Sequence, residues 1–396
     1  MITPAYSPTA TERVLPRMAL DFTTGILDPR VTVARALNTA TRVNSSGFIE
    51  TVNANLPRFD YDRSTLAPKG LLIETTRANL VLQSADVSQA AWAKVGTGVA
   101  LAPVVTPNAG ISPDGTNNAV RVQFDCTNAS SLSNRSRIQQ SVTLVTSTTY
   151  SEGVWVKAYD PSNVGKTVRF LVEGVSGTFT YTLTDQWVRI SPASGAATGT
   201  SGTFMLETRG TVTTQTADIL MWNATLEAGA FLTSDIITGA TSLTRNVDQV
   251  AMTGTNFSDW YNQSEGAFAA EYIPPTIATT LGVLSVNDGT TNNRIDARSN
   301  GTSFVTSGGA TQAIMVATGA VANAINRCVV GYKLNSFAFA VNGNAPATDT
   351  SGSIPTVSRL VIGAVDNFSP SLNGHMRKLR YWPLRITNAE VQAFSK

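Results

Sequence analysis

The single histidine, His375 in the stretch LNGHMRKL, limits the nucleophilic chemistry that this chain could perform. A Ser-His-Asp or Cys-His arrangement would have to use this residue as its base. The sequence contains no Gly-x-Ser-x-Gly elbow that could supply a matching nucleophile. We therefore predict that His375 lies in a turn or at the end of a strand and takes no part in catalysis.

Hydrolysis of glycosidic bonds would need two carboxyl groups held about 5 to 9.5 Å apart. The glutamates that could supply them are scattered singly along the chain: Glu152, Glu173, Glu227, Glu265 and Glu271. Asp60 and Asp62 in LPRFDYDR share one face of a strand, but such carboxylates are more simply solvated or paired with the neighbouring arginines. The sequence therefore predicts that the chain is not an enzyme. A glycan depolymerase ranks third, behind two functions that involve binding alone.

Metal-binding residues show a similarly weak pattern. No His or Cys pair stands at zinc-ligand spacing. The stretch NDGTTNNRID offers four oxygen-bearing side chains that could bind calcium: Asn287, Asp288, Asn292 and Asp296. Because Asn and Asp also form turns without any ion, we favour the turn and predict no metal and no cofactor. Cys126 and Cys328 lie about two hundred residues apart, so we expect two reduced, buried thiols.

Binding of a sugar has softer requirements than catalysis. An exposed aromatic platform beside amides and carboxylates is the usual composition, and Trp260 and Tyr261 in NFSDWYNQSEG provide it. They form the candidate glycan platform, and the alternative is a tryptophan that covers the edge of a sandwich. The stretch MRKLRYW could form a basic strip for an anionic glycan, or a strand with Arg377, Lys378 and Arg380 in water.

Overall charge excludes several partners. The 396 residues include 29 basic and 27 acidic ones, which gives a net charge of +2. Such a balance produces no long-range field that would favour nucleic acid or an anionic membrane. The opening residues show no secretory signal, and the longest weakly polar run, QAIMVATGAVANAI, is too short to span a bilayer. We expect a soluble chain made in a cytoplasm, with no nucleic-acid partner and no membrane insertion.

The elements that would position these residues are strands. Only 14% of residues are charged, and Thr, Ser, Asn and Gly supply most of the remaining surface, as suits sheets and tight turns. In FTYTLT, Phe179, Tyr181 and Leu183 alternate with threonines, which is the period of a strand. Asn342-Gly343 after SFAFAV indicates a hairpin turn. One short helical turn is expected in SADVSQAAWAK, and a short helix is expected at the C-terminus, where Thr387 and Glu390 form a capping-box pattern.

Chain length implies more than one domain, because 396 residues exceed what one core normally supports. Residues 1–70 contain a hairpin pattern around Ser45-Ser46-Gly47 but too few large apolar residues for a core, so we expect an N-terminal arm. Residues 71–240 and 247–396 each show repeated short strands, which predict two antiparallel β-sandwiches in tandem. The Thr-rich residues between them are expected to form a short seam.

Three stretches carry a resemblance to a known group of proteins. ALDFTTGILDPRVTVARALNTATRVNSSGFIE, LPRFDYDRSTLAPKGLLIETTRANLVLQSADVSQAAWAK and WNATLEAGAFLTSDIITGATSLTRNVDQVAM resemble tailed-bacteriophage tail-fibre, tail-tip and head-appendage proteins. The middle region resembles a carbohydrate-binding-module-type jelly roll. The final region, with SFAFAVNGNAP, GHMRKLRYWPLRIT and NAEVQAF in that order, resembles a concanavalin A-like, laminin G-like sandwich.

The resemblance implies a virion structural protein assembled in a bacterial cytoplasm, with residues 1–70 as its virion-attachment segment. Its expected role is a tail-tip, fibre or appendage component that contacts the host surface by binding a glycan, with the C-terminal module facing the glycan. The alternative is a capsid-decorating, head-fibre or collar protein whose sandwiches contact other virion proteins. The resemblance also implies a homo-oligomer, with a trimer favoured, although no heptad repeat indicates it.

Overall fold

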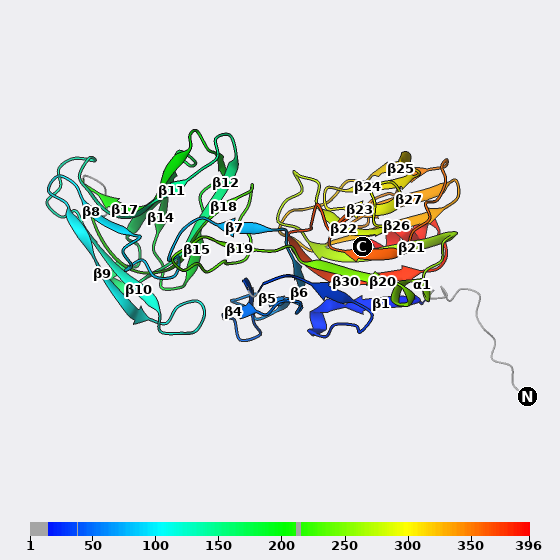
Figure 1. The fold of residues 1–396 in the computed structure, drawn as a ribbon, viewed down its shortest axis with the longest axis horizontal. Coiled ribbons are helices and arrows are strands. Elements are labelled where there is room, and N and C mark those ends of the chain that lie inside the picture. Colours follow the sequence, from blue (N-terminus) through cyan, green and yellow to red (C-terminus); the bar gives the residue numbers. More distant parts are fainter. Residues whose placement is uncertain (1–14, 38, 211–214) are drawn as a thin grey trace, which may run out of the picture. The chain divides into compact units, whose positions relative to one another are not determined.

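Strands dominate the structure, as the alternating sequence pattern predicts. The computed structural model describes residues 15–37, 39–210 and 215–396 (Figure 1). The helices of the described residues are the 3-10 turns η1 (Phe22–Thr24) and η2 (Pro161–Asn163) and the α-helices α1 (Thr255–Ser258) and α2 (Asn388–Phe394). Neither α-helix has the length or the apolar character that a membrane-spanning segment would need. The predicted all-β class is confirmed.

The chain divides into two compact units that interleave along the sequence. The C-terminal unit combines residues up to Ala34 with Pro68–Thr75 and Asp248–Lys396. The middle unit combines Arg35–Ala67 with Thr76–Val247. The expected division into an arm and two consecutive domains is therefore wrong in one respect, because the first seventy residues are shared between the units.

Two antiparallel sheets form the C-terminal unit. One runs in the order β28 (Ala347–Asp349), β27 (Ser336–Val341), β26 (Asn326–Lys333), β21 (Glu265–Ile273), β30 (Gly374–Trp382) and β6 (Pro68–Ile73), with β1 (Met18–Asp21) also paired to β30. The other runs β2 (Thr32–Ala34), β20 (Gln249–Thr253), β29 (Arg359–Ile362), β22 (Gly282–Asn287), β23 (Arg294–Arg298), β24 (Thr302–Ser307) and β25 (Ala310–Val316). Helix α2 covers part of the first sheet through Val391, which packs with Ala338 and Trp382.

The N-terminal strands belong to this unit because their apolar side chains complete its core. Strand β1 pairs with β30, so that Met18 lies opposite Tyr381, and β2 pairs with β20, so that Val33 lies opposite Val250. Met18 and Val33 are buried, as are Leu20, Phe22 and Val31. The segment looked too poor in large apolar residues to form a core, and it instead contributes those residues to a core made elsewhere in the chain.

Two further sheets form the sandwich of the middle unit. The first runs β15 (Val188–Ile190), β12 (Thr149–Ala158), β18 (Thr216–Ala228), β10 (Ala119–Asp125) and β9 (Leu101–Gly110), with β16 (Gly195–Ala196) paired to β12. The second runs β14 (Phe179–Thr182), β13 (Thr167–Glu173), β17 (Ser201–Arg209), β11 (Arg135–Thr143) and β8 (Ala93–Gly96). Two smaller pairs are β19 (Leu243–Arg245) with β7 (Arg77–Asn79) and β3 (Ala40–Val43) with β4 (Ile49–Val52). Strand β5 (Phe59–Tyr61) follows β4 in the chain.

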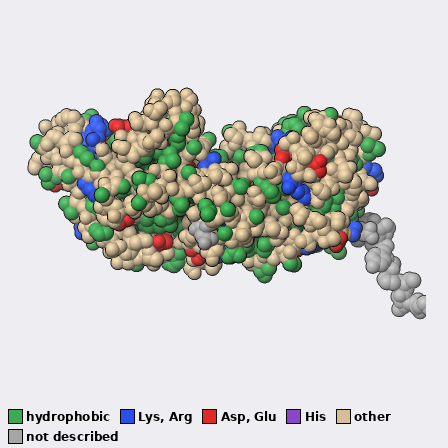
Figure 2. Space-filling model, in the orientation of Figure 1, with side chains coloured by type: hydrophobic (Ala, Val, Ile, Leu, Met, Phe, Trp, Pro, Cys, Tyr) green, Lys and Arg blue, Asp and Glu red, His purple; other side chains and the backbone are tan. Residues whose placement is uncertain are grey.

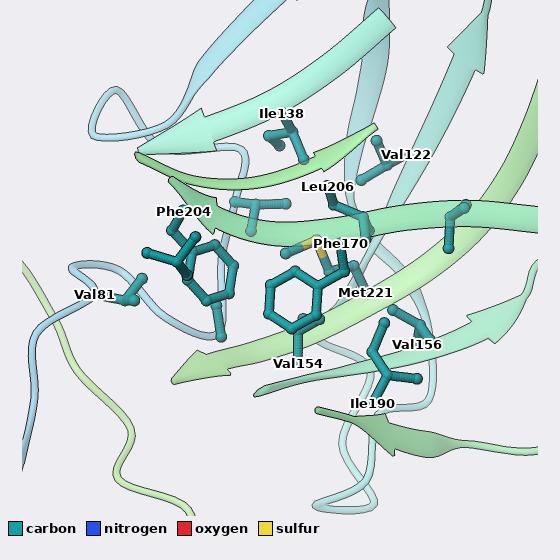
Figure 3. Close-up of a cluster of buried hydrophobic side chains, with 14 of the residues drawn as sticks. Val81, Val122, Ile138, Val154, Val156, Phe170, Ile190, Phe204, Leu206 and Met221 are labelled. Carbon is teal, nitrogen blue, oxygen red and sulfur yellow. The ribbon is translucent and has the colours of Figure 1, made fainter. Parts of the chain in front are cut away.

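The core of the middle unit lies between these two sheets. Figure 3 shows Phe170 and Phe204 from one sheet and Val154 and Met221 from the other directed into a shared interior. The rings of Phe170 and Phe204 lie 5.0 Å apart, and Trp92 meets Phe204 edge-on at 5.7 Å. Trp92 lies near the end of SADVSQAAWAK, where a single helical turn was predicted and the structure has a succession of turns without helix. Asp86 accepts hydrogen bonds from Ser88 in an Asx turn, a local alternative to the helix.

The Thr-rich stretch expected as a seam is an integral part of the middle unit. Strand β19 pairs with β7, and Thr233 and Asp235 are buried. Thr41 donates a hydrogen bond of 2.6 Å to the carbonyl oxygen of Asp235, and Arg58 donates one of 2.9 Å to Ser234. The Thr41 contact ties the stretch to the β3–β4 hairpin, which was predicted around Gly47 and is confirmed.

The remaining local predictions hold. Asn342 and Gly343 both have positive φ, as the hairpin prediction requires, although the loop extends to β28 at Ala347. Helix α2 begins with the predicted capping box, in which Thr387 and Glu390 bind each other's backbone N–H groups. The face of the molecule in Figure 2 carries charged side chains in isolated groups among a mostly uncharged surface.

Candidate functional site

The aromatic pair predicted as a glycan platform is part of the core of the C-terminal unit. Trp260 is 3% exposed, and its ring meets Phe257 edge-on at 5.1 Å and Tyr381 at 5.0 Å. Its indole N–H donates a 2.6 Å hydrogen bond to the carbonyl oxygen of Asn256. Tyr261 stacks on Phe257 at 4.5 Å, and burial raises the pKa of its phenol. Trp260 is buried and Tyr261 is half-buried against the same rings, so the pair does not present the exposed platform that was predicted.

The carboxylates do not form the pair that glycoside hydrolysis requires. Glu265 and Glu271 lie on the same strand, six residues apart, which places them about 20 Å from each other. Glu152 lies opposite Leu226 and therefore points to the other face of the sheet from Glu227, the next residue along β18. Glu173 is exposed at the end of β13.

Asp60 and Asp62 stabilise the local backbone. Asp60 accepts a 2.7 Å hydrogen bond from the N–H of Val43. Asp62 accepts hydrogen bonds from the N–H groups of Ser64 and Thr65, and these bonds lower the pKa of its carboxyl. Both carboxylates therefore accept hydrogen bonds from backbone N–H groups, which is a structural role.

The residues considered for calcium are also engaged with protein groups. Asp288 accepts hydrogen bonds from Thr290 and from the amide of Asn293, all between 2.7 and 2.8 Å. Asp296 is fully buried and binds Arg298 at 2.9 Å. In the described ranges, no three His, Cys, Asp or Glu side chains gather in a way that could hold a metal ion. The turn interpretation of NDGTTNN fits these contacts.

His375 and the two cysteines lie where the sequence places them. His375 is the second residue of β30, opposite Leu72. Cys126 and Cys328 are free and buried, and burial raises the pKa of the Cys328 thiol to about 12. The predictions of a strand-end histidine and of reduced thiols are confirmed.

The stretch MRKLRYW forms most of β30, with alternating burial. Met376, Leu379 and Tyr381 are fully buried, whereas Arg380 is exposed. Arg377 binds Glu271 at 2.8 Å, and Lys378 lies 3.3 Å from Asp21. The sequence favoured a strand over a basic strip, and the strand carries one strongly exposed cation.

A recess of about 350 Å³ lies on the outer face of β21 and β30 beside α2. The side chains that give it its chemical character are Glu271, Arg327, Lys378, Arg380, Trp382, Phe394 and Lys396, and we call it the basic recess. Trp382 is almost fully covered by neighbours that include Phe394, whose ring stacks on it at 4.9 Å and is 37% exposed. The accessible aromatic surface is therefore that of Phe394, one turn of helix beyond the capping box.

Charge in the basic recess is predominantly positive. Glu271 accepts hydrogen bonds of 2.8 Å from both Arg327 and Arg377. Burial alone would raise the pKa of Glu271, but these two guanidinium groups lower it below its usual value, so the carboxylate stays ionised. Arg380 and Lys396 form no ion pair with any residue that the structure describes. The recess can therefore present two cations, an aromatic ring and a fixed carboxylate to a ligand.

Sequence reasoning missed the basic recess because it is assembled from three distant segments. The sequence predicted the C-terminal helix that carries Phe394 and the strand that carries Arg380, but the proximity of these two side chains depends on where α2 packs. The signal that could have identified it was the exposed cation of MRKLRYW combined with the closing helix.

Comparisons with known proteins give structural neighbours only. The chain matches no protein-family model and no curated protein. Among solved structures, the CBM40 of Ruminococcus gnavus IT-sialidase bound to α2,3-sialyllactose is 12% identical and has a TM-score of 0.29, with 34% of this chain and 84% of that chain covered. The CBM22-1–CBM22-2 tandem of Paenibacillus barcinonensis Xyn10C is 9% identical with a TM-score of 0.27, covering 80% and 98%. Mouse laminin α1 domains LG4-5 are 8% identical with a TM-score of 0.24, covering 78% and 88%. Scores this low carry no information on the residues or ligands of this chain.

Proposed function

We propose that this protein is a non-catalytic recognition protein that binds a glycan through the basic recess of its C-terminal unit. The observation that carries the proposal is the combination, in one recess, of the exposed Arg380, Lys396 and the accessible ring of Phe394. An aromatic ring can cover the apolar face of a sugar, while guanidinium and ammonium groups donate hydrogen bonds to its oxygens.

The biological setting that we propose is a bacteriophage virion, with the chain as a tail-tip, fibre or appendage component that contacts a bacterial surface glycan. This setting rests on the sequence resemblance described above. A weakly charged surface rich in Thr, Ser and Asn is compatible with it, because contact with sugars and with other proteins both favour such surfaces.

A glycan-binding experiment on the full chain tests the recess. We expect the protein to bind at least one surface polysaccharide of its host, and Arg380→Ala to weaken that binding about tenfold, the effect of losing a charged hydrogen bond. Lys333→Ala is the matched control, since Lys333 is an exposed cation on the same sheet outside the recess. Equal affinities of the two variants, or no binding of any host polysaccharide, would refute the proposal. Release of reducing ends from the polysaccharide would instead indicate a depolymerase.

A second candidate function is that of a capsid-decorating, head-fibre or collar protein, and exposed apolar side chains in the middle unit favour it. Leu101 and Val104 on the edge strand β9 are each 61% exposed, and Val99 just before it is 58% exposed. Exposed apolar side chains gathered in this way are typical of protein contact surfaces. If copies of the chain meet here, Val104→Glu should shift the oligomer, expected to be a trimer, towards monomer in sedimentation experiments.

A further inference from the structure

Arg380 has no side-chain partner on the sheet face that carries the basic recess. The residues directly opposite it are Ala19 on β1 and Ala269 on β21, and an alanine side chain offers no acceptor. Alternate residues of β30 share a face, so Lys378 and Trp382 flank Arg380 at about 7 Å along the strand. Arg380 is exposed and forms no ion pair or side-chain hydrogen bond with any residue that the structure describes. Its guanidinium is therefore available to a molecule in the recess.

Lys396 reaches the same recess from the end of α2. Its backbone N–H donates to the carbonyl oxygen of Ala393, and its stem passes over Gly343, where a Cβ would lie only 2.6 Å from the Cγ of the lysine. The absence of a side chain at Gly343 thus leaves the space in which the stem packs. Lys396 is exposed, and its ammonium group has no acceptor among the described residues. The recess therefore holds a second available cation.

The other charged side chains of the recess do not offset these two cations. Glu271 is the one acid among the described residues that line it, and it lies opposite Arg327 and Lys378 on the neighbouring strands. Glu271 accepts hydrogen bonds from Arg327 and Arg377, and Lys378 lies 3.3 Å from Asp21. With the two available cations, five positive and two negative side chains meet here, an excess of three positive charges.

Such an excess favours a charged ligand over a neutral one. A neutral sugar would remove water from Arg380 and Lys396 and supply only hydroxyl dipoles in return, so part of the hydration energy of both cations would be lost. An anionic group replaces that water with charge-assisted hydrogen bonds, and the guanidinium fork fits carboxylate and phosphate oxygens alike.

We propose that the glycan bound in the basic recess is anionic, with a carboxylate or phosphate group held by Arg380 and Lys396 and a sugar ring against Phe394. This inference rests on the proposed function and adds the class of glycan to it. Carboxylate and phosphate offer these cations the same chemistry, and the experiment below distinguishes them.

The form of the recess argues against larger anionic partners. Nucleic acid and anionic membranes bind through many cations spread over a wide surface. Here two available cations lie in a recess of about 350 Å³, beside a ring that is 37% exposed. A recess of this kind can admit a single sugar unit, whereas the surface of a membrane cannot enter it.

The test measures binding of the full chain to bacterial polysaccharides of known composition, both neutral and acidic. Each acidic polysaccharide is also presented after reduction of its carboxyl groups to alcohols and after removal of its phosphates. We expect at least one acidic polysaccharide to bind, and loss of its charged group to lower the affinity at least about tenfold. Weaker binding after carboxyl reduction identifies a sugar acid, and weaker binding after dephosphorylation identifies a sugar phosphate. Affinity for the acidic form should also fall as salt is added, because salt screens exposed charges.

Variants of Arg380 show whether the recess causes this preference. Arg380→Gln removes the charge, so the ratio of the affinities for the acidic and the uncharged form should fall by about tenfold. Arg380→Lys retains the charge and should retain most of the preference. Lys333→Gln is the matched control, since Lys333 is an exposed cation of the same sheet that lies 3.5 Å from Glu265, outside the recess. Its affinities should stay within about twofold of wild type. Thermal unfolding of each variant identifies any that fail to fold.

The two proposals fail in different ways. If no polysaccharide binds, or if Arg380→Gln and Lys333→Gln change binding equally, the recess is not a glycan site and both proposals are overturned. If binding depends on Arg380 but the acidic, reduced and neutral forms bind with equal affinity, the glycan function stands and the anionic ligand is overturned. Tighter binding of an oligonucleotide or of anionic phospholipid vesicles than of any acidic polysaccharide would also overturn it.

Discussion

At the residue scale, Glu152 shows how burial alone changes the chemistry of a carboxyl group. Its neighbours on the inward face of β12 are Tyr150 and Val154, both part of the core of the middle unit. The side chain is fully buried, and its two carboxyl oxygens find no partner that meets hydrogen-bond geometry among the described residues. Burial raises the pKa of Glu152 from 4.5 to about 7. The neutral acid is therefore the form that the fold favours.

Stability should fall with rising pH because of this residue. The folded pKa lies above the unfolded value, so the contribution of Glu152 is complete below pH about 4.5 and is lost as pH rises through about 7. We expect Glu152→Gln, which stays neutral, to exceed wild type in free energy of unfolding by up to about 3 kcal/mol at pH 8.5, and by much less at pH 5. Urea unfolding at the two pH values measures this difference. Parallel pH profiles of the two proteins would contradict it.

Arg245 is a second buried ionisable side chain, and the groups that surround it explain why the Thr-rich stretch is polar. The guanidinium is fully buried and donates hydrogen bonds of 3.0 Å to the hydroxyls of Thr233 and Ser234. Burial raises the pKa of Glu227, while the charge of Arg245 and hydrogen bonds from Thr233 oppose that shift. The stretch is polar because it must satisfy these groups inside the unit.

Removal of Arg245 should be strongly destabilising. Arg245→Ala removes the larger of the two positive charges that act on the buried Glu227, the other being that of Arg189, so we expect a loss of about 3 to 5 kcal/mol in the free energy of unfolding. Arg245→Lys keeps the charge but loses the forked N–H donors, so its free energy of unfolding should lie between those of wild type and Arg245→Ala. Denaturant unfolding with Arg380→Ala as an exposed-arginine control measures the effect. A loss no greater than that of the control would show that the buried network contributes little.

At the scale of elements, α2 connects local sequence to the basic recess. The side chain of Thr387 accepts a hydrogen bond from the N–H of Glu390, and the Glu390 carboxylate accepts one of 2.7 Å from the N–H of Thr387. This box fixes where the helix begins and hence where Phe394 meets Trp382. The capping motif was visible in the sequence, whereas the contact between the two rings was not.

We expect Thr387→Ala to lower stability by about 1 kcal/mol, the usual effect of removing a helix N-cap. Faster hydrogen exchange at the amide of Glu390 should accompany the loss, because that N–H no longer has its acceptor. Thr387→Ser retains the hydroxyl and should behave like wild type in both measurements. If Thr387→Ala matches Thr387→Ser, the box does not stabilise the helix.

At the scale of the whole molecule, the two units share the N-terminal region of the chain. Residues 15–34 supply β1 and β2 to the C-terminal unit, and Pro68–Thr75 supply β6. A fragment that begins near residue 245 therefore lacks three strands of that unit. Binding experiments on the recess consequently need the full chain.

Deletion of residues 1–34 should destabilise the C-terminal unit. It removes five apolar side chains from the core: Met18, Leu20, Phe22, Val31 and Val33. Each contributes about 1.5 to 3 kcal/mol when fully buried, so we expect the unfolding transition of this unit to fall by well over 10 °C or to disappear. Deletion of residues 1–14 keeps all five and is the control. Calorimetry that shows the same transitions for both deletions would mean that β1 and β2 are dispensable.

Much of this protein could be predicted from the sequence, because the relevant signals are local. Three features each depend on residues that are close together in the sequence. They are the alternation in FTYTLT and MRKLRYW, the turn residues Asn342 and Gly343, and the capping box of Thr387. The same holds for the scattered glutamates, whose spacing argued against an acid pair. These features set the all-β class and the strand-end position of His375.

Tertiary structure decided which strands become neighbours and which side chains are covered. Periodicity shows that Arg137, Arg169 and Glu207 lie on faces of strands, but only the register of β11, β13 and β17 brings them together. In the same way, the residues around Trp260 have the composition of a sugar platform, but Trp260 is buried partly by Tyr381 of β30, which lies more than a hundred residues away in the chain. Sheets join distant segments through backbone hydrogen bonds, which carry little information about side-chain identity. The local pattern therefore predicts the face of the strand on which a side chain lies, whereas its neighbours on that face depend on the pairing and register of the strands.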